Sequence, residues 1–222
     1  NLIELGITRF DTSPRYKDAE KYLGEIISNS QSNLLIDSKV IDLKPQDPNS
    51  ENIIFNQVKK SLKTLNLENL NVLYLHQNQM EILMDKYIQE GLEKILEKGL
   101  AKKIGISVYN HIELNYGINN DLFNVIQAPI NILNNSFYKK FNQNKKSLKK
   151  ELVARSIFIQ GALFSNDILK LKKLNFELYE KIQLLSNICK ENKTSIENEA
   201  KYSVLSLKRP SIIQSSLSIN NL

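Results

Sequence analysis

The stretch ITRFDTSPRY (7–16) joins a short apolar run to a carboxylate, a Thr-Ser-Pro turn and a tyrosine. The run contains Ile7 and Phe10 and ends on Asp11, and Tyr16 follows the turn. A short apolar run bounded by turn residues is typical of a β-strand. The same arrangement, an apolar run that finishes on a polar side chain, recurs along the rest of the chain. We therefore take residues 7–11 as the first of a series of strands.

Short apolar runs alternate with amphipathic helical stretches throughout the sequence. One helical stretch has Ile54, Val58, Leu62 and Leu65 on one face, and Gly99 stops another. Strands that alternate with helices predict a parallel sheet with crossover helices, either a (β/α) barrel or a doubly wound sheet. The predicted strands are ITRFD (7–11), LLIDSK (34–39), VLYLH (72–76), KIGIS (103–107), NVIQAP (124–129), LVARS (152–156) and SIIQS (211–215).

Two observations favour the barrel. None of the chain's 7 glycines forms a G-x-G motif, so the glycine turn of a dinucleotide-binding doubly wound sheet is missing. In addition, nearly every predicted strand ends on a polar residue, and the carboxyl ends of barrel strands converge on one mouth. The fold class that we expect is therefore α/β, a (β/α)8 TIM barrel. The polar strand-end residues are Asp11, Lys39, His76, Ser107, Gln127 and Ser156.

The composition is that of an ordinary globular chain. Its 222 residues, 41% hydrophobic and 24% charged, are enough for one large domain with a real core. The net charge of +6 is spread along the chain. We expect its one local cluster, KKFNQNKKSLKK (139–150), to be a solvated face rather than a nucleic-acid site.

The same composition bears on cellular location. The single cysteine, Cys189, excludes an internal disulfide and predicts a reducing, cytoplasmic location. No apolar run reaches the roughly 18 residues of a membrane span, and no signal peptide opens the chain. We therefore expect no membrane association. With 2 histidines and 1 cysteine, a zinc site is not expected either.

Asp11, Tyr16, Lys39 and His76 form a proton-transfer set if their strands are neighbours. Tyrosine is a poor acid near neutral pH because the pKa of its phenol is about 10. A lysine ammonium beside the phenol lowers that pKa, and a carboxylate beside the lysine keeps the lysine charged. A histidine on the next strand can hydrogen-bond a substrate oxygen. Such a set suits protonation of a carbonyl oxygen while hydride reaches the carbon.

These motifs resemble the signature of the aldo-keto reductases along the whole chain. The sequence also resembles one branch of that family, whose members often accompany surface-polysaccharide biosynthesis. The blocks similar to the family signature are FDTSPRY (10–16) with AEKYLGE (19–25), LLIDSK (34–39), NVLYLH (71–76) and GLEKILEKGLAKKIGISVYN (91–110). The blocks similar to the branch are IGISVY (104–109), QAPIN (127–131) and RSIFIQG (155–161).

The resemblance implies an activity and a role for each matching position. It implies an oxidoreductase that transfers hydride between NADP(H) or NAD(H) and a small carbonyl or alcohol, with a sugar or sugar nucleotide as a candidate substrate. Tyr16 matches the general acid, Lys39 the residue that lowers the tyrosine pKa, Asp11 the partner of that lysine, and His76 the residue that orients the substrate carbonyl. The positions implied to contact the cofactor are Ser107, Gln127, Arg155, Ser156, Ser215 and Ser218.

Several positions depart from the family pattern. Lys17 replaces the glycine that normally follows the tyrosine, and Val108 stands where many members have a carboxamide-binding asparagine. Arg155 stands where many have a ring-stacking aromatic residue, although its flat guanidinium can stack instead. Ser215 replaces the usual glycine of the last phosphate loop. Since no arginine follows it to hold a 2′-phosphate, the preference between NADPH and NADH stays open.

We expect residues 1–222 to form one aldo-keto reductase barrel domain that is truncated at both ends. The family's first strand and closing C-terminal helices have no counterpart in the sequence. A rival interpretation is a non-catalytic relative that keeps the barrel as a binding or regulatory subunit. The intact set of Asp11, Tyr16, Lys39 and His76 argues against this rival, and the altered phosphate loop argues for it. A barrel phosphatase or aldolase is a weaker rival, because the chain lacks a metal cluster or a strand lysine free of a tyrosine partner.

Overall fold

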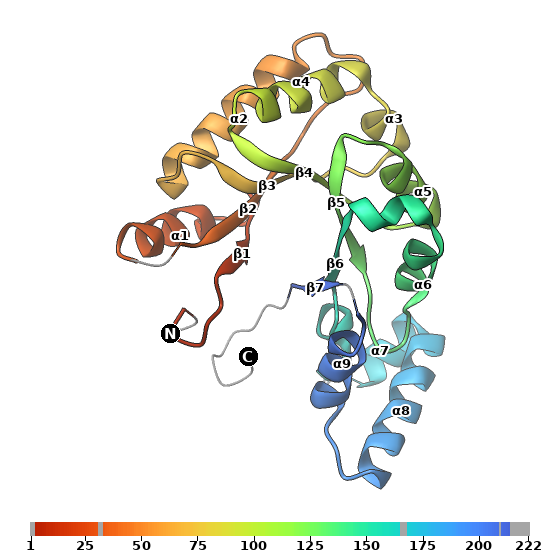
Figure 1. Ribbon diagram of the computed structural model, residues 1–222. Coiled ribbons are helices and arrows are strands. Elements are labelled where there is room, and N and C mark those ends of the chain that lie inside the picture. The colour runs from red at the N-terminus through yellow and green to blue at the C-terminus, as the bar shows by residue number, and fades with distance from the viewer. Residues whose placement is uncertain (1–2, 31–32, 165–167, 209, 214–222) are drawn as a thin grey trace.

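A computed structural model of the protein describes residues 3–30, 33–164, 168–208 and 210–213. Within these residues seven strands pair in parallel, each with the next along the chain, to form one curled sheet. Figure 1 shows the sheet curving through an arc, with helices on its convex side and β1 and β7 at its two ends. The architecture is an incomplete (β/α)8 barrel, as the sequence predicted.

Every predicted strand overlaps an observed one, and the last two residues of the seventh predicted strand, 214–215, lie outside the described residues. The strands are β1 (Arg9–Asp11), β2 (Leu35–Val40), β3 (Leu70–Leu75), β4 (Ala101–Ser107), β5 (Phe123–Pro129), β6 (Glu151–Arg155) and β7 (Ser211–Ile212). The α-helices are α1 (Ala19–Ser28), α2 (Ser50–Leu65), α3 (Met80–Leu83), α4 (Lys86–Glu97), α5 (His111–Asn119), α6 (Ser136–Gln143), α7 (Ile168–Leu174), α8 (Phe176–Glu191) and α9 (Ile196–Leu205). Two 3₁₀ helices, η1 (Lys145–Lys149) and η2 (Ile159–Phe164), complete the described elements.

The main core lies between the convex face of the sheet and the helices. The predicted stripe of α2, from Ile54 to Leu65, is buried there against outward-facing strand residues such as Leu73 and Ile104. Gly99 follows α4 with a φ of +64°, a left-handed conformation that glycine adopts without steric cost, so it ends the helix as predicted. Burial of this apolar area is the dominant favourable contribution to folding.

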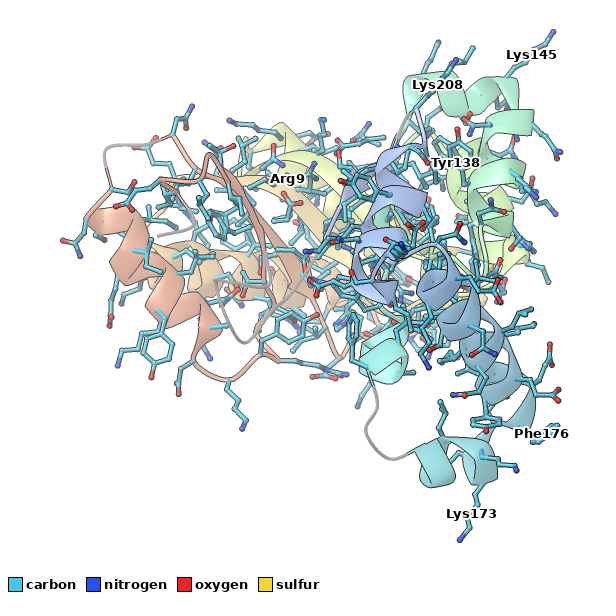
Figure 2. The ribbon with its side chains drawn as sticks, turned by 90° about the horizontal axis from the view of Figure 1, so that it is seen from below. Arg9, Tyr138, Lys145, Lys173, Phe176 and Lys208 are labelled. Carbon is cyan, nitrogen blue, oxygen red and sulfur yellow. The ribbon has the colours of Figure 1, made fainter. Side chains whose placement is uncertain are left out.

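The basic cluster at residues 139–150 lies on α6, η1 and the residues after them. Lys139, Lys140, Lys146 and Lys149 are exposed, and Figure 2 shows Lys145 projecting from the outer edge of the molecule. Lys150 differs, because its ammonium donates to the backbone carbonyls of Asn120 and Phe123 in the α5–β5 connection. The lysines of the cluster are thus solvated, as expected, except Lys150, whereas Phe141 and Ser147 in the same segment are buried. None of the helices in the described ranges is long and apolar enough to cross a membrane.

The concave face of the sheet has a charged network near the amino ends of its strands. Arg9 donates to Asp37 at 2.9 Å and also pairs with Glu151, which contacts Lys103 at 3.0 Å. Asn71 donates to the other oxygen of Asp37 at 2.7 Å. Figure 2 shows Arg9 far from Lys173 and Phe176, which lie at the tip of α7 and α8. These polar groups occupy positions where many barrels place branched apolar residues.

Tyr74 fills the middle of the concave face, above the charged network. Its side chain is fully buried with Val72, Val125 and Val153. The ring fits because β4 has a glycine opposite it: a Cβ atom at Gly105 would lie 2.5 Å from two ring carbons of Tyr74. The Tyr74 hydroxyl has no hydrogen-bond partner among the described residues. Gly105 is therefore needed for packing rather than for backbone freedom.

We predict that Gly105→Ala destabilises the protein by about 1–3 kcal/mol, because the added methyl group overpacks the concave face. Tyr74→Phe is the control: it removes a buried hydroxyl without a partner, so stability should be unchanged or slightly higher. Urea unfolding of both variants measures the free energies of unfolding. Equal stability of Gly105→Ala and the wild type would contradict this packing account.

Candidate active site

A buried ion pair joins the first two strands at their carboxyl ends. The Lys39 ammonium lies 2.6 Å from the Asp11 carboxylate and 2.7 Å from the backbone carbonyl of Thr12. Thr12 is held in place because its N–H donates to the Asp37 carbonyl, which extends the ladder between β1 and β2. Lys39 is only 2% exposed. The predicted contact between Lys39 and Asp11 is present, and the lysine points into the mouth rather than among the helices.

Tyr16 reaches the same place from the loop after β1. A turn with a hydrogen bond from the Tyr16 N–H to the Ser13 carbonyl reverses the chain. The tyrosine ring lies against the lysine, with the Lys39 ammonium 5.1 Å from the ring centroid, and is 45% exposed. Lys17 has a φ of +49°, a left-handed conformation that costs a residue with a Cβ atom about 1–2 kcal/mol and that glycine adopts without this cost.

The pKa of Tyr16 is raised in the structure. Burial raises it above its ordinary value of 10, and Asp11 and Tyr109 raise it further, while Arg155 opposes them. The role expected of Lys39, which is to lower this pKa, stays a prediction. The lysine charge is paired with Asp11, and its described contact with Tyr16 is through the ring. The phenol is therefore protonated at neutral pH.

His76 follows β3 directly and faces the same mouth. Its backbone N–H donates to the Val40 carbonyl at 3.2 Å, and its buried Nδ1 has no partner among the described residues. Burial lowers the pKa of His76 below its ordinary value, and the positive charges of Lys39 and Arg15 lower it further. The imidazole is thus neutral near pH 7 and has a ring nitrogen left for hydrogen bonding.

Ser107 and Gln127 continue the polar set onto β4 and β5. The Ser107 hydroxyl donates to the Gln127 side-chain oxygen at 3.1 Å, and the Gln127 amide donates to Asp11 at 3.3 Å. The Gln127 amide has two N–H donors and two acceptor lone pairs, and these two bonds use one of each. Within the described residues one N–H and one lone pair of this amide stay unused, and they are a complementary pair for a primary carboxamide such as that of nicotinamide. The residues present therefore fit the nicotinamide end of the cofactor.

Arg155 and Ser156 border this group at the end of β6. The Arg155 guanidinium stacks on the Tyr109 ring at 4.1 Å and donates to the Val108 carbonyl at 3.0 Å. Val108, at the position where many family members have an asparagine, is buried, and its backbone carbonyl accepts this bond from Arg155. Ser156 has a φ of +57° and accepts the N–H of Ile159 through its carbonyl. The remaining two predicted residues, Ser215 and Ser218, lie outside the described residues.

Sequence reasoning missed the residues that fix the loops around the mouth. The buried Glu113 accepts from the backbone N–H of Tyr109 at 2.6 Å and from the Asn78 side chain at 2.8 Å. It thereby joins the loops after β3 and β4. The spacing of Asn110 and Glu113 was the available signal, because it is that of a capping box, which the structure contains. Gln77 similarly bonds both the N–H and the carbonyl of Leu43.

A resident metal has no obvious site in the described part of the chain. No group of three or more histidine, cysteine, aspartate or glutamate side chains lies close enough there to hold an ion.

Comparison with known proteins identifies the family. The model of the aldo/keto reductase family matches residues 1–217, so the chain belongs to this family. Its members are NAD(P)H-dependent oxidoreductases that act on small carbonyl compounds, and the chain is one of them. No curated protein sequence matches the chain.

Solved structures of other aldo-keto reductases share the fold. A glycerol dehydrogenase from Gluconobacter oxydans is 17% identical with a TM-score of 0.76, over 99% of this chain and 75% of that one. An aldo-keto reductase from Bacillus halodurans in its holo form is 21% identical with a TM-score of 0.72, over 97% and 74%. One from Klebsiella pneumoniae, in complex with NADP and acetate, is 16% identical with a TM-score of 0.69, over 98% and 73%.

We predict a strong energetic coupling between Lys39 and Asp11. Lys39→Met leaves the Asp11 carboxylate without its ammonium partner and should lower the free energy of unfolding by about 3–5 kcal/mol. The double variant Lys39→Met/Asp11→Asn removes both charges, so it should lose less than the sum of the single losses. Urea unfolding of the four proteins gives the coupling.

Lys94→Met serves as the control, because Lys94 pairs with Glu51 on the outer surface. Its effect should be small, since exposed ion pairs contribute little. Strictly additive losses for Lys39 and Asp11 would show that the two charges do not act as a pair.

Proposed function

We propose that this protein reduces a carbonyl group with NAD(P)H, with Tyr16 as the general acid, and catalyses the reverse oxidation of the alcohol. The observation that carries the proposal is the buried Lys39, paired with Asp11 and lying against the ring of Tyr16. A protonated phenol, a neutral imidazole and a fixed cation beside one mouth suit proton transfer to a carbonyl oxygen.

Each residue has a defined part in this proposal. Bound NAD(P)H supplies the hydride for the carbonyl carbon. Tyr16 gives its phenolic proton to the carbonyl oxygen as negative charge develops there, and His76 hydrogen-bonds that oxygen and orients it. The Lys39 ammonium, held by Asp11, stabilises the phenolate that Tyr16 becomes. In the oxidative direction the phenolate takes the proton back.

We assign the carboxamide of the cofactor to Ser107 and Gln127, because the Gln127 amide keeps one free donor and one free acceptor. The guanidinium of Arg155 has one face on Tyr109, which leaves the opposite face for the nicotinamide ring. Ser156, and Ser215 and Ser218 outside the described residues, remain our candidates for contacts with the cofactor phosphates.

The substrate and location are finer proposals. The similarity of IGISVY, QAPIN and RSIFIQG to one branch of the family supports a sugar or sugar nucleotide as the carbonyl compound. The single, buried Cys189 supports a cytoplasmic location, where thiols stay reduced.

Replacement of Tyr16 tests the proposed acid. Tyr16→Phe should leave NADPH binding nearly intact and lower kcat by about 10²- to 10⁴-fold, because the proton donor acts in the transition state. Steady-state reduction of aldehydes and fluorescence titration with NADPH measure the two effects. Tyr87→Phe is a matched control, since Tyr87 on α4 is similarly exposed, at 41%. A Tyr16→Phe variant with wild-type turnover would exclude the acid, and NADPH binding without any wild-type turnover would support the non-catalytic rival.

The pH dependence of reduction gives an independent test. The acid form of Tyr16 is required, and its pKa is raised above the ordinary value of 10. The rate should therefore be constant through neutral pH and fall only above pH 10, where the phenol loses its proton. Measurement of kcat/KM against pH for an uncharged aldehyde locates this alkaline limb. A limb well below pH 10 would mean that the phenol is more acidic in the complex than the structure indicates.

A further inference from the structure

Residues 76–79 connect β3 to α3 and include His76, which we proposed to orient the carbonyl oxygen. Within the described part of the chain, no backbone–backbone hydrogen bond involves Gln77 or Asn78. Two side chains hold the segment instead. The Gln77 amide bonds the N–H of Leu43, after β2, at 2.6 Å and its carbonyl at 2.9 Å. Side-chain contacts therefore position this segment, and a single substitution can remove each of them.

The second contact is made by Asn78, toward α5. Its side-chain amide donates to Glu113 at 2.8 Å, and Glu113 is only 4% exposed. The Glu113 oxygens also accept hydrogen bonds from the backbone N–H groups of Tyr109 and Asn110 and from the Asn110 side chain. Among the described residues, the bond from Asn78 to Glu113 is the one hydrogen bond between residues 77–79 and the region from β4 to α5.

Both ends of this link lie beside groups with proposed roles. Asn78 is two residues after His76, and Tyr109 is two residues after Ser107, which we assigned to the nicotinamide carboxamide. A buried carboxylate is unfavourable without hydrogen-bond donors, so Glu113 holds its donors from the two loops together. The link therefore fixes the segment of His76 relative to the cofactor side of the mouth.

We propose that Asn78 is a positioning residue, whose hydrogen bond to Glu113 sets the separation between His76 and the cofactor side of the mouth. The inference rests on the proposed function and adds to it a residue that acts through His76. A misplacement of about 1 Å can slow a reaction by about 100-fold, so this separation bears directly on the rate of hydride transfer.

Single-turnover kinetics of Asn78→Ala test the inference. The variant removes the link and leaves the other three hydrogen bonds of Glu113, and with them the N-terminal cap of α5, in place. The protein loaded with NADPH is mixed with benzaldehyde, and the oxidation of NADPH is followed. The rate constant should fall by about 10- to 100-fold at full amplitude, with NADPH affinity nearly unchanged. Damage to the fold would instead lower the amplitude, which reports the fraction of active protein.

Asn119→Ala is the matched control, because it makes the same change on α5. The Asn119 amide donates to the Asn115 carbonyl of the same helix, on an exposed part of the surface. The rate constant of this variant should equal that of the wild type. Thermal unfolding verifies that each variant is folded.

Asn78→Asp tests the hydrogen bond itself. At neutral pH this variant places a second carboxylate against Glu113, and the two charges repel each other. Repulsion raises the pKa of one carboxyl group of such a pair, and the retained proton then restores a hydrogen bond between them. The charge of Arg155 attracts Glu113 and opposes this protonation, so recovery should need acidic pH. The rate constant relative to the wild type should rise between about pH 8 and about pH 5, whereas that of Asn78→Ala should stay low.

Imidazole NMR signals give a readout without turnover. The chain has only 2 histidines, so the signals of His76 are readily assigned. Asn78→Ala should shift the His76 signals, because the segment that carries the ring loses its link to Glu113. Asn119→Ala should leave them in place.

The outcomes distinguish this inference from the proposed function. A wild-type rate constant in Asn78→Ala, a loss confined to amplitude or to NADPH affinity, or an Asn78→Asp variant that stays slow at acidic pH would overturn the inference and leave the proposed function standing. Absence of wild-type turnover with every aldehyde would overturn the proposed function. The NMR signals would then decide the positioning separately, since His76 signals that Asn78→Ala does not shift contradict it.

Discussion

The burial of the Lys39 ammonium is the constraint on which the rest of the mouth depends. A buried cation is strongly unfavourable unless it is paired and hydrogen-bonded. The Asp11 carboxylate and the Thr12 carbonyl meet this need only because β1 and β2 pair in one register, with Asp11 beside Asp37. A shift of either strand by one residue would turn its charged side chain toward the helices and away from its partner. The ion pair therefore fixes the register of the strands as well as the chemistry.

The concave face has polar groups at both levels because side chains alternate along a strand. Asp11 and Arg9 lie two positions apart on β1, and Lys39 and Asp37 do so on β2, so each strand supplies one member to the mouth and one to the charged network below it. Tyr74 lies between the two levels and contacts Lys39 through its ring, 5.8 Å from the ammonium. The Lys39–Asp11 pair at the mouth and the Arg9–Asp37 network below it thus lie in the same low-dielectric interior.

The loops around the mouth are held with unequal strength. Glu113 and Gln77 bond backbone groups of neighbouring loops from buried or partly buried positions, which fixes the surroundings of His76 and Tyr109. The loop that contains Tyr16 depends instead on its own turn and on the exposed ion pair between Arg15 and Asp42. Exposed ion pairs contribute little stability. The proposed acid therefore lies on a less constrained support than the groups that orient the substrate.

The sequence by itself determined the strands, their order and the residues at their carboxyl ends. Apolar runs and helical stripes are local patterns that the chain retains whatever its tertiary contacts, and parallel strands place their ends together by topology. The pairing of Lys39 with Asp11 and the roles of Tyr16 and His76 were expected from the resemblance to the aldo-keto reductases as well as from these patterns. The tertiary structure alone decided the direction of the Tyr16 pKa, the stacking of Arg155 on Tyr109 and the network around Arg9 and Asp37. These depend on burial and on distances between side chains from different strands, which no local pattern specifies.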